Sequence, residues 1–119
     1  MGPVLLCDDA VAYGTLFKHW MGQAGIEDVA HARTAAEAVQ LAGELQPHVI
    51  VLDHLLPDGT SDVLLPQLRE VAPAARVLLI SGMPDDKLAE IAAAAGADGH
   101  VGKWATTDVL RDAVLALMR

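Results

Sequence analysis

Side chains able to do chemistry stand where four short apolar segments of the chain end. They are Asp8 and Asp9, then Asp53, then Ser81 and finally Lys103. Three carboxylates held together repel one another, and a divalent cation relieves that repulsion. Mg²⁺ is the expected ion because it prefers oxygen ligands and retains water molecules that a phosphate can replace. A carboxylate nucleophile, a metal, a hydroxyl and an ammonium together suit phosphoryl transfer.

Each of these residues also has a simpler interpretation when it is taken alone. The acidic pair suits the N-cap of a helix, Ser81 a turn, Lys103 a solvated surface, and Asp53 the loop before a turn at 57–59. Their occurrence in order, at four successive segment ends, favours one shared site over four unrelated features.

The elements that must position these residues alternate along the chain. Apolar segments occur at 3–8, 27–32, 48–53, 76–81 and 98–102, and segments of helical period at 11–24, 34–46, 61–71, 85–95 and 106–118. The first, third and fourth apolar segments are nearly continuous in Val, Ile and Leu, which is typical of strands buried on both faces of a parallel sheet.

Local signals set the ends of several helices. Thr34 opens the second helical segment with a capping-box pattern, and Gly96 suits a C-cap after the fourth. Pro66 lies inside the third segment, where it is expected to kink the helix or end its first part. Val109 is predicted to lie on the apolar side of the amphipathic fifth helix.

Strands alternating with helices predict one α/β domain over residues 1–119, a doubly wound (βα)5 parallel sheet with right-handed crossovers. Ligands of such sheets bind beyond the carboxyl ends of the strands. Asp8, Asp9, Asp53, Ser81 and Lys103 all lie at or just beyond those ends.

Composition excludes several function classes. The formal charge is −8, from 16 acidic residues against 8 Lys and Arg, which argues against direct nucleic-acid binding. No apolar stretch approaches the roughly 20 residues of a membrane span, and the N-terminus lacks the pattern of a signal peptide. Cys7 is the one cysteine, which excludes an internal disulfide and suits a reducing cytoplasm.

With these residues in view, the sequence resembles the response-regulator receiver domain of two-component signalling, the family that includes the chemotaxis response regulator. The resemblance covers essentially the whole chain and implies a flavodoxin-like sheet of strand order 2-1-3-4-5. Its five signature positions fall on Asp53 as the phosphorylated aspartate, Asp8 and Asp9 as the acidic pair, Ser81 as the switch hydroxyl and Lys103 as the family's lysine.

The resemblance also implies a ligand set and partners. Asp9 would bind Mg²⁺ directly and Asp8 mostly through water, with Asp53 and the backbone carbonyl of Leu55 as further ligands. The phosphoryl donor would be a histidine kinase or a histidine phosphotransfer protein. Signalling would use the face formed by the fourth helix, fifth strand and fifth helix. The domain is expected to be a phosphoacceptor that assists its own phosphorylation and dephosphorylation, and a stand-alone regulator is favoured over an excised domain.

Two other functions are weighed against this one. A pseudo-receiver would bind a partner constitutively, but all the reactive positions are filled here. A phosphatase of the haloacid dehalogenase type also forms an aspartyl phosphate, yet it needs a second aspartate two residues after the nucleophile, where this chain has Leu55. The sequence identifies neither the cognate kinase nor the downstream target, and it leaves a homodimer open.

Two positions depart from the family pattern. His100 stands where Tyr or Phe is usual, and it is either a strand residue without a role or a polar switch that titrates near neutral pH. Trp104 stands where a proline, typically after a cis bond, is common. A trans bond is expected here because a non-proline cis bond costs about 3 kcal/mol. Trp104 itself is interpreted either as core or as an exposed anchor for a partner.

Overall fold

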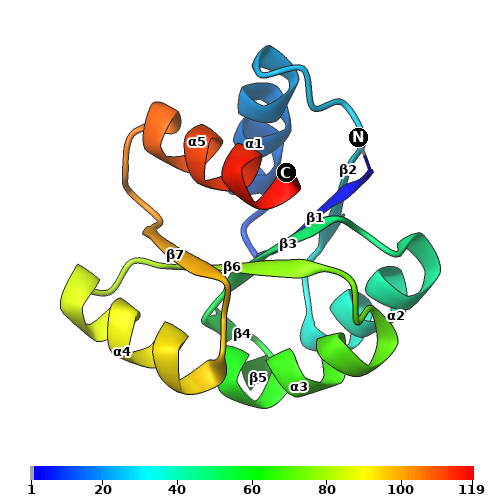
Figure 1. The fold of residues 1–119 in the computed structure, drawn as a ribbon, viewed down its shortest axis with the longest axis vertical. Helices are drawn as coiled ribbons and strands as arrows, with labels where there is room; N and C mark the ends of the chain where they lie inside the picture. Colours follow the sequence, from blue (N-terminus) through cyan, green and yellow to red (C-terminus); the bar gives the residue numbers. More distant parts are fainter. Residues whose placement is uncertain (1) are drawn as a thin grey trace.

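A five-stranded parallel sheet lies between two layers of helices in the computed structural model, which describes residues 2–119 (Figure 1). The strands are, across the sheet, β2 Val29–Ala32, β1 Val4–Cys7, β3 Val49–Asp53, β6 Arg76–Ser81 and β7 Gly99–Gly102. Every neighbouring pair is parallel. The predicted order 2-1-3-4-5 and the doubly wound architecture are therefore confirmed.

The helices divide between the two faces of the sheet. Helices α1 Val11–Gln23 and α5 Thr107–Met118 cover one face, and α2 Ala35–Leu45, α3 Ser61–Val71 and α4 Asp85–Ala95 cover the other (Figure 1). Within residues 2–119, no helix is long and apolar enough to cross a membrane.

Alternation along the strands builds two separate apolar cores. In β3, Val49 and Val51 belong to the cluster under α1 and α5, whereas Ile50 and Leu52 belong to the cluster under α2, α3 and α4. Successive side chains of a strand point to opposite faces, so a strand covered on both sides must be apolar at every position. This explains the continuous apolar segments in the sequence.

Helix termini follow the local signals. The Thr34 hydroxyl accepts a hydrogen bond from the Glu37 backbone N–H at 3.1 Å. Gly96 ends α4 in the left-handed conformation with φ of 74°, which a side chain would disfavour. Helix α3 continues through Pro66 without a break because Leu65 and Leu68, on either side of it, are buried against the sheet.

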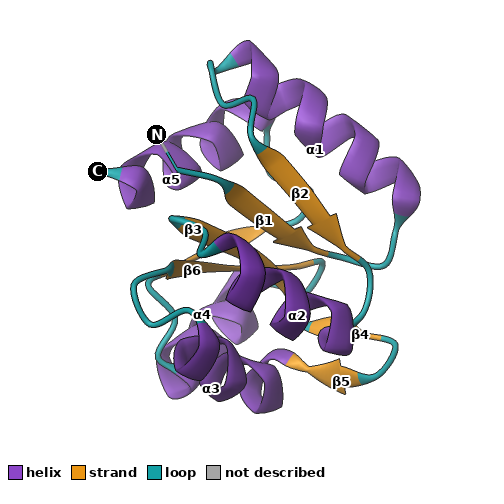
Figure 2. Ribbon diagram, turned by 90° about the vertical axis from the view of Figure 1, so that its right-hand side faces the viewer, coloured by secondary structure: helices purple, strands orange, loops and turns teal. Residues whose placement is uncertain are grey.

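Two features differ from the sequence-based expectations. A small antiparallel hairpin, β4 Leu55–Leu56 and β5 Gly59–Thr60, separates β3 from α3 (Figure 2). Val109 was predicted to lie on the apolar side of the fifth helix, but the residue is 51% exposed. Val109 lies in the first turn of α5, beside the buried stripe that Leu110 and Val114 form.

Candidate functional site

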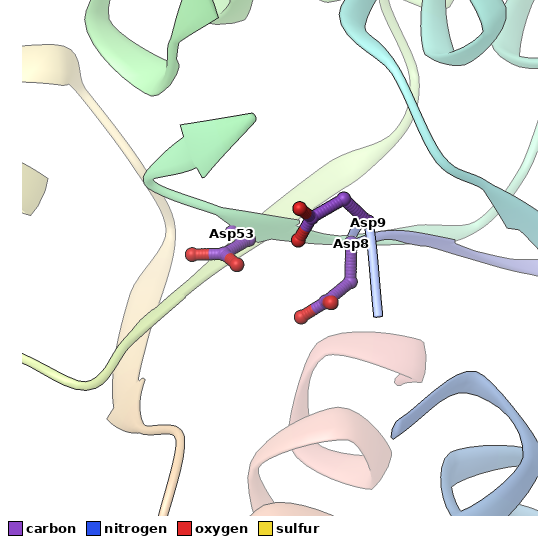
Figure 3. A group of neighbouring side chains, drawn as sticks. All are labelled: Asp8, Asp9 and Asp53. Atoms are coloured by element: carbon purple, nitrogen blue, oxygen red, sulfur yellow. The ribbon is translucent and has the colours of Figure 1, made fainter. Parts of the chain in front are cut away.

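Three carboxylates meet at the carboxyl edge of the sheet. Asp8 and Asp9 follow β1, and Asp53 ends the neighbouring strand β3. One side-chain oxygen of each lies within 4.8 Å of the others, and Figure 3 shows the three groups facing a common space. Asp8 and Asp53 are buried while Asp9 is exposed. The parallel pairing of β1 with β3 thus brings these predicted site residues together.

Lys103 reaches this acidic cluster from the loop after β7. Its ammonium nitrogen Nζ lies 2.6 Å from Asp8 Oδ2 and 3.4 Å from Asp53 Oδ2, and the side chain is only 14% exposed. Burial by itself lowers the pKa of Lys103, but the hydrogen bond with Asp8 and the charge of Asp53 outweigh it, and the pKa is raised. The site therefore holds a permanent cation beside two buried carboxylates.

The same contacts shape the ionisation of Asp53. Burial raises its pKa, while the Lys103 ammonium and a hydrogen bond from the Leu55 backbone N–H at 3.3 Å oppose this effect. The net pKa is above the ordinary range for aspartate. The Lys103 ammonium and the Leu55 N–H thus favour the ionised form of Asp53, which is the form that a nucleophile needs.

The backbone of Asp8 is held from β2. His31 Nε2–H donates to the Asp8 carbonyl oxygen at 2.6 Å, and the Ala10 N–H donates to Asp8 Oδ1 at 2.8 Å. The His31 ring fits because residue 14 in α1 is glycine. A Cβ at Gly14 would stand 2.3 Å from two ring atoms of His31. The sequence indicated no role for His31 beyond a structural or surface one.

Ser81 ends β6, the strand next to β3. It follows Ile80, which is the register partner of Asp53, and it is 3% exposed. Its hydroxyl accepts a hydrogen bond from the Met83 N–H at 3.2 Å, and its carbonyl accepts one from the Lys103 N–H at 2.8 Å. Ser81 therefore connects the strand end of β6 to the loop that carries the lysine.

The loop after Asp53 is tied to helix α2. The Asp58 carboxylate accepts hydrogen bonds from the first two backbone N–H groups of α2, from Ala35 at 2.6 Å and from Ala36 at 3.1 Å. These bonds lower the pKa of Asp58. The sequence marked Asp58 only as a turn residue. The helix cap was missed because it joins segments 23 residues apart.

Trp104 is 80% exposed, so its interpretation as a core residue is wrong. No peptide bond in residues 2–119 is cis, which agrees with the trans bond expected before Trp104. The indole lies against the loop that follows Ser81, since a Cβ at Gly82 would stand 3.3 Å from Trp104 Nε1. His100 Nε2 lies 3.6 Å from Asp85 Oδ1 of α4, an ion pair only when the imidazole is protonated.

Two further residues adjoin the acidic cluster. Cys7 is fully buried, and burial raises the pKa of its thiol, which keeps it a small apolar group. Tyr13 was not singled out in the sequence. It lies in the first turn of α1 with its ring centroid 4.8 Å from Lys103 Nζ.

Comparisons with known proteins now identify the family. A family model described as the response regulator receiver domain matches residues 4–115. The chain belongs to this family. It is 26% identical to the chemotaxis protein CheY of Bacillus subtilis over 111 residues, which are 93% of this chain and 92% of CheY.

Solved structures of other receiver domains superpose closely on this one. A LuxR-family two-component response regulator from Aurantimonas sp. SI85-9A1 has a TM-score of 0.89 and 28% identity, over 99% of this chain and 85% of that one. A response regulator from Burkholderia pseudomallei, crystallised with a phosphorylated aspartic acid and a calcium ion, has a TM-score of 0.83 and 25% identity. That match covers 100% of this receiver domain and 67% of the other chain.

The residues of this receiver domain suit the metal that its family uses. Receiver domains bind Mg²⁺ in an acidic pocket, and here Asp8, Asp9 and Asp53 offer carboxylate oxygens within 4.8 Å of one another. An all-oxygen set with one exposed member fits a hard divalent cation that keeps part of its water shell. The chain is thus a receiver domain with a cluster that fits a metal.

Proposed function

We propose that this domain accepts a phosphoryl group from a phosphohistidine onto Asp53 and signals through a face formed by α4, β7 and α5. Residues 1–119 would form one such domain, acting in the cytoplasm with a histidine kinase or a histidine phosphotransfer protein as donor. One observation carries the proposal. The buried carboxylate of Asp53 lies beside an acidic pair and a lysine ammonium at the carboxyl edge of the sheet.

The transfer follows from the groups present. An Asp53 carboxylate oxygen forms a bond to phosphorus, the phosphorus–nitrogen bond of the donor breaks, and its electron pair stays on the donor imidazole. Lys103, 3.4 Å from Asp53 Oδ2, offsets negative charge that gathers at the acceptor. Asp8, Asp9, Asp53 and the Leu55 carbonyl would hold Mg²⁺, which would supply positive charge to the phosphoryl oxygens.

The switch residue is Ser81. Its oxygen accepts the Met83 N–H, which leaves its own O–H free to donate to a phosphoryl oxygen on Asp53. A shift of Ser81 moves Gly82, which lies next to the Trp104 indole, since a Cβ built on Gly82 would stand 3.3 Å from Trp104 Nε1. Two residues at the output face are therefore candidates for responding to phosphorylation. Trp104 is exposed beside Gly82, and His100 lies 3.6 Å from Asp85 of α4.

Phosphorylation is tested by incubating the protein with Mg²⁺ and acetyl phosphate and measuring the intact mass. Wild type is expected to gain the mass of one phosphoryl group, and the Asp53→Asn variant is expected to gain none. Beryllium fluoride should shift the amide NMR signals around Ser81 in wild type only. A wild-type protein that remains unmodified under both treatments would favour a pseudo-receiver that acts by constitutive binding.

The output role of Trp104 is tested by fluorescence. With Trp20 replaced by Phe, the emission of Trp104 should shift on beryllium fluoride addition, because the indole lies next to Gly82 in the loop that follows Ser81. An unchanged spectrum contradicts a role in output. A His100→Phe variant that keeps phosphorylation-dependent partner binding would assign His100 no part in the switch.

A further inference from the structure

The ammonium of Lys103 has a third neighbour besides the two carboxylates. Its Nζ lies 4.8 Å from the centroid of the Tyr13 ring, over the ring face. The negative face of an aromatic ring attracts a cation within about 6 Å, and the attraction grows when water is excluded. Here the lysine side chain is 14% exposed and Tyr13 is 5% exposed, so the contact is largely desolvated.

The ring is itself held in a defined orientation. Tyr13 belongs to the apolar core under α1 and α5. Trp20, two turns further along α1, packs on it in a T-shaped arrangement with centroids 5.9 Å apart and planes at 81°. Such edge-to-face pairs are favourable because the positive edge of one ring meets the negative face of the other. The ring face offered to Lys103 is therefore supported by packing on Trp20 and on the core.

The hydroxyl group of Tyr13 does not provide the contact with Lys103. Burial, Asp8 and Asp53 raise the pKa of Tyr13 to about 12, so the ring is neutral at physiological pH. The hydroxyl is buried and has no hydrogen-bond partner among residues 2–119. Removing it breaks no bond and relieves an unsatisfied polar group. Any contribution of Tyr13 to the site must come from the ring face.

We propose that Tyr13 is a positioning residue that keeps the ammonium of Lys103 aimed at Asp53 through its ring face. This inference rests on the proposed function of Asp53. In the structure Lys103 lies 0.8 Å closer to Asp8 than to Asp53, from distances of 2.6 and 3.4 Å. A metal cation that binds the acidic cluster competes with Lys103 for the Asp8 carboxylate. The neutral ring does not bind the metal, so its hold on Lys103 persists when the charges around the lysine change.

The closing experiment compares Tyr13→Phe, which keeps the ring, with Tyr13→Leu, which keeps an apolar side chain but no ring. The first readout is the NMR signal of the lysine ε-methylene groups in protein labelled at lysine. Protons above a ring face are shielded, and the chain has three lysines, of which Lys18 and Lys87 are exposed and serve as internal references. Lys18→Arg and Lys87→Arg variants assign the signals.

The expected result has two parts. The Lys103 signal is shifted upfield in wild type and in Tyr13→Phe, without any metal, and returns to the reference position in Tyr13→Leu. Phosphorylation by acetyl phosphate at saturating Mg²⁺ is near the wild-type rate in Tyr13→Phe and about three- to thirty-fold slower in Tyr13→Leu. Rescue by Phe separates a ring-face role from a hydroxyl role.

Three outcomes would overturn the inference. An unshifted Lys103 signal in wild type means that the lysine does not lie on the ring. A Tyr13→Leu variant that folds, as its amide spectrum would show, and is phosphorylated at the wild-type rate means that the ring does not position Lys103. Wild-type protein that takes up no phosphate while its Lys103 signal is shifted overturns the proposed function and leaves Tyr13 only a structural contact.

Discussion

Residue by residue, the site depends on neighbours that take no direct part in its chemistry. Asp8 is oriented by His31, whose Nε2–H binds its carbonyl oxygen at 2.6 Å. His31 can reach it only because Gly14 has no side chain. A glycine within a helix costs about 1 kcal/mol relative to alanine. This local cost is offset by the hydrogen bond that fixes Asp8.

The effect of a Gly14→Ala substitution on the free energy of unfolding is therefore expected to have opposite signs in wild type and in a protein without His31. In wild type it lowers the free energy of unfolding by about 1 kcal/mol, because the new Cβ displaces His31 and breaks its partly buried hydrogen bond to Asp8. In a His31→Ala background it raises that free energy by about 1 kcal/mol, because only the helix propensity remains. Urea unfolding of the four proteins measures both effects. Stabilisation by Gly14→Ala in wild type would show that His31 does not need the space.

Among the elements, α2 and the loop after Asp53 are joined by a cap that neither segment makes alone. Thr34 satisfies the N–H of Glu37, and Asp58 satisfies those of Ala35 and Ala36. Free N–H groups and the positive end of the helix dipole both favour a carboxylate at this position. The hairpin that carries Leu55 is thereby held to helix α2.

The Asp58 cap predicts a specific pH dependence. Because the folded protein lowers the pKa of Asp58, its contribution to stability is present above the ordinary aspartate pKa of about 3.9 and is lost as pH falls through the lower folded value. Asp58→Ala should be less stable than wild type at pH 7, with the difference shrinking below about pH 4. Asp58→Asn should lie between them, since one oxygen can accept one of the two bonds. Urea unfolding across this pH range is the measurement, and a difference independent of pH would contradict a carboxylate cap.

Helix α3 offers a second element-scale prediction. Pro66 is exposed and lies inside a continuous helix, where it removes one backbone hydrogen bond. A proline there costs about 3 kcal/mol in the folded state and recovers about 1 kcal/mol by restricting the unfolded chain. Pro66→Ala is thus expected to raise the free energy of unfolding by about 2 kcal/mol. Exposed Gln67→Ala in the same helix serves as a control, and equal effects of the two changes would contradict a proline-specific cost.

At the scale of the whole molecule, an acidic chain brings three of its 16 acidic side chains together in one partly buried cluster. The chain carries a formal charge of −8, and three of its carboxylates converge at the carboxyl edge of the sheet, where Lys103 forms ion pairs with Asp8 and Asp53. Like charges in a partly buried cluster destabilise the folded state until a counter-charge binds. Cation binding at the acidic cluster is therefore expected to affect the free energy of unfolding of the domain.

Mg²⁺ is accordingly expected to stabilise the domain. A cation that binds only the folded state adds about 2.7 kcal/mol at a concentration one hundred times its Kd. Thermal unfolding with Mg²⁺ should occur at a higher temperature than in chelator, with NaCl used to match ionic strength. Asp9→Asn is expected to remove most of this gain, because Asp9 is the exposed member of the cluster and its change leaves the core intact. A Tm that responds equally in both proteins would indicate non-specific screening.

Much of this domain was determined by the sequence because the relevant signals are local. Continuous apolar segments predict strands buried on two faces, helical periods predict the intervening helices, and the order of the segments places Asp8, Asp53 and Lys103 at one edge of the sheet. The residue types there indicate the kind of chemistry. None of these inferences requires knowing which side chains touch.

The contacts themselves were decided by the tertiary structure. The Lys103–Asp53, His31–Asp8 and Ala35–Asp58 hydrogen bonds join residues 50, 23 and 23 positions apart. Their geometry depends on strand register and on the packing of α1 and α2, which periodicity along a single segment does not encode. For the same reason the exposure of Trp104 and the ring of Tyr13 beneath Lys103 became visible only in the fold.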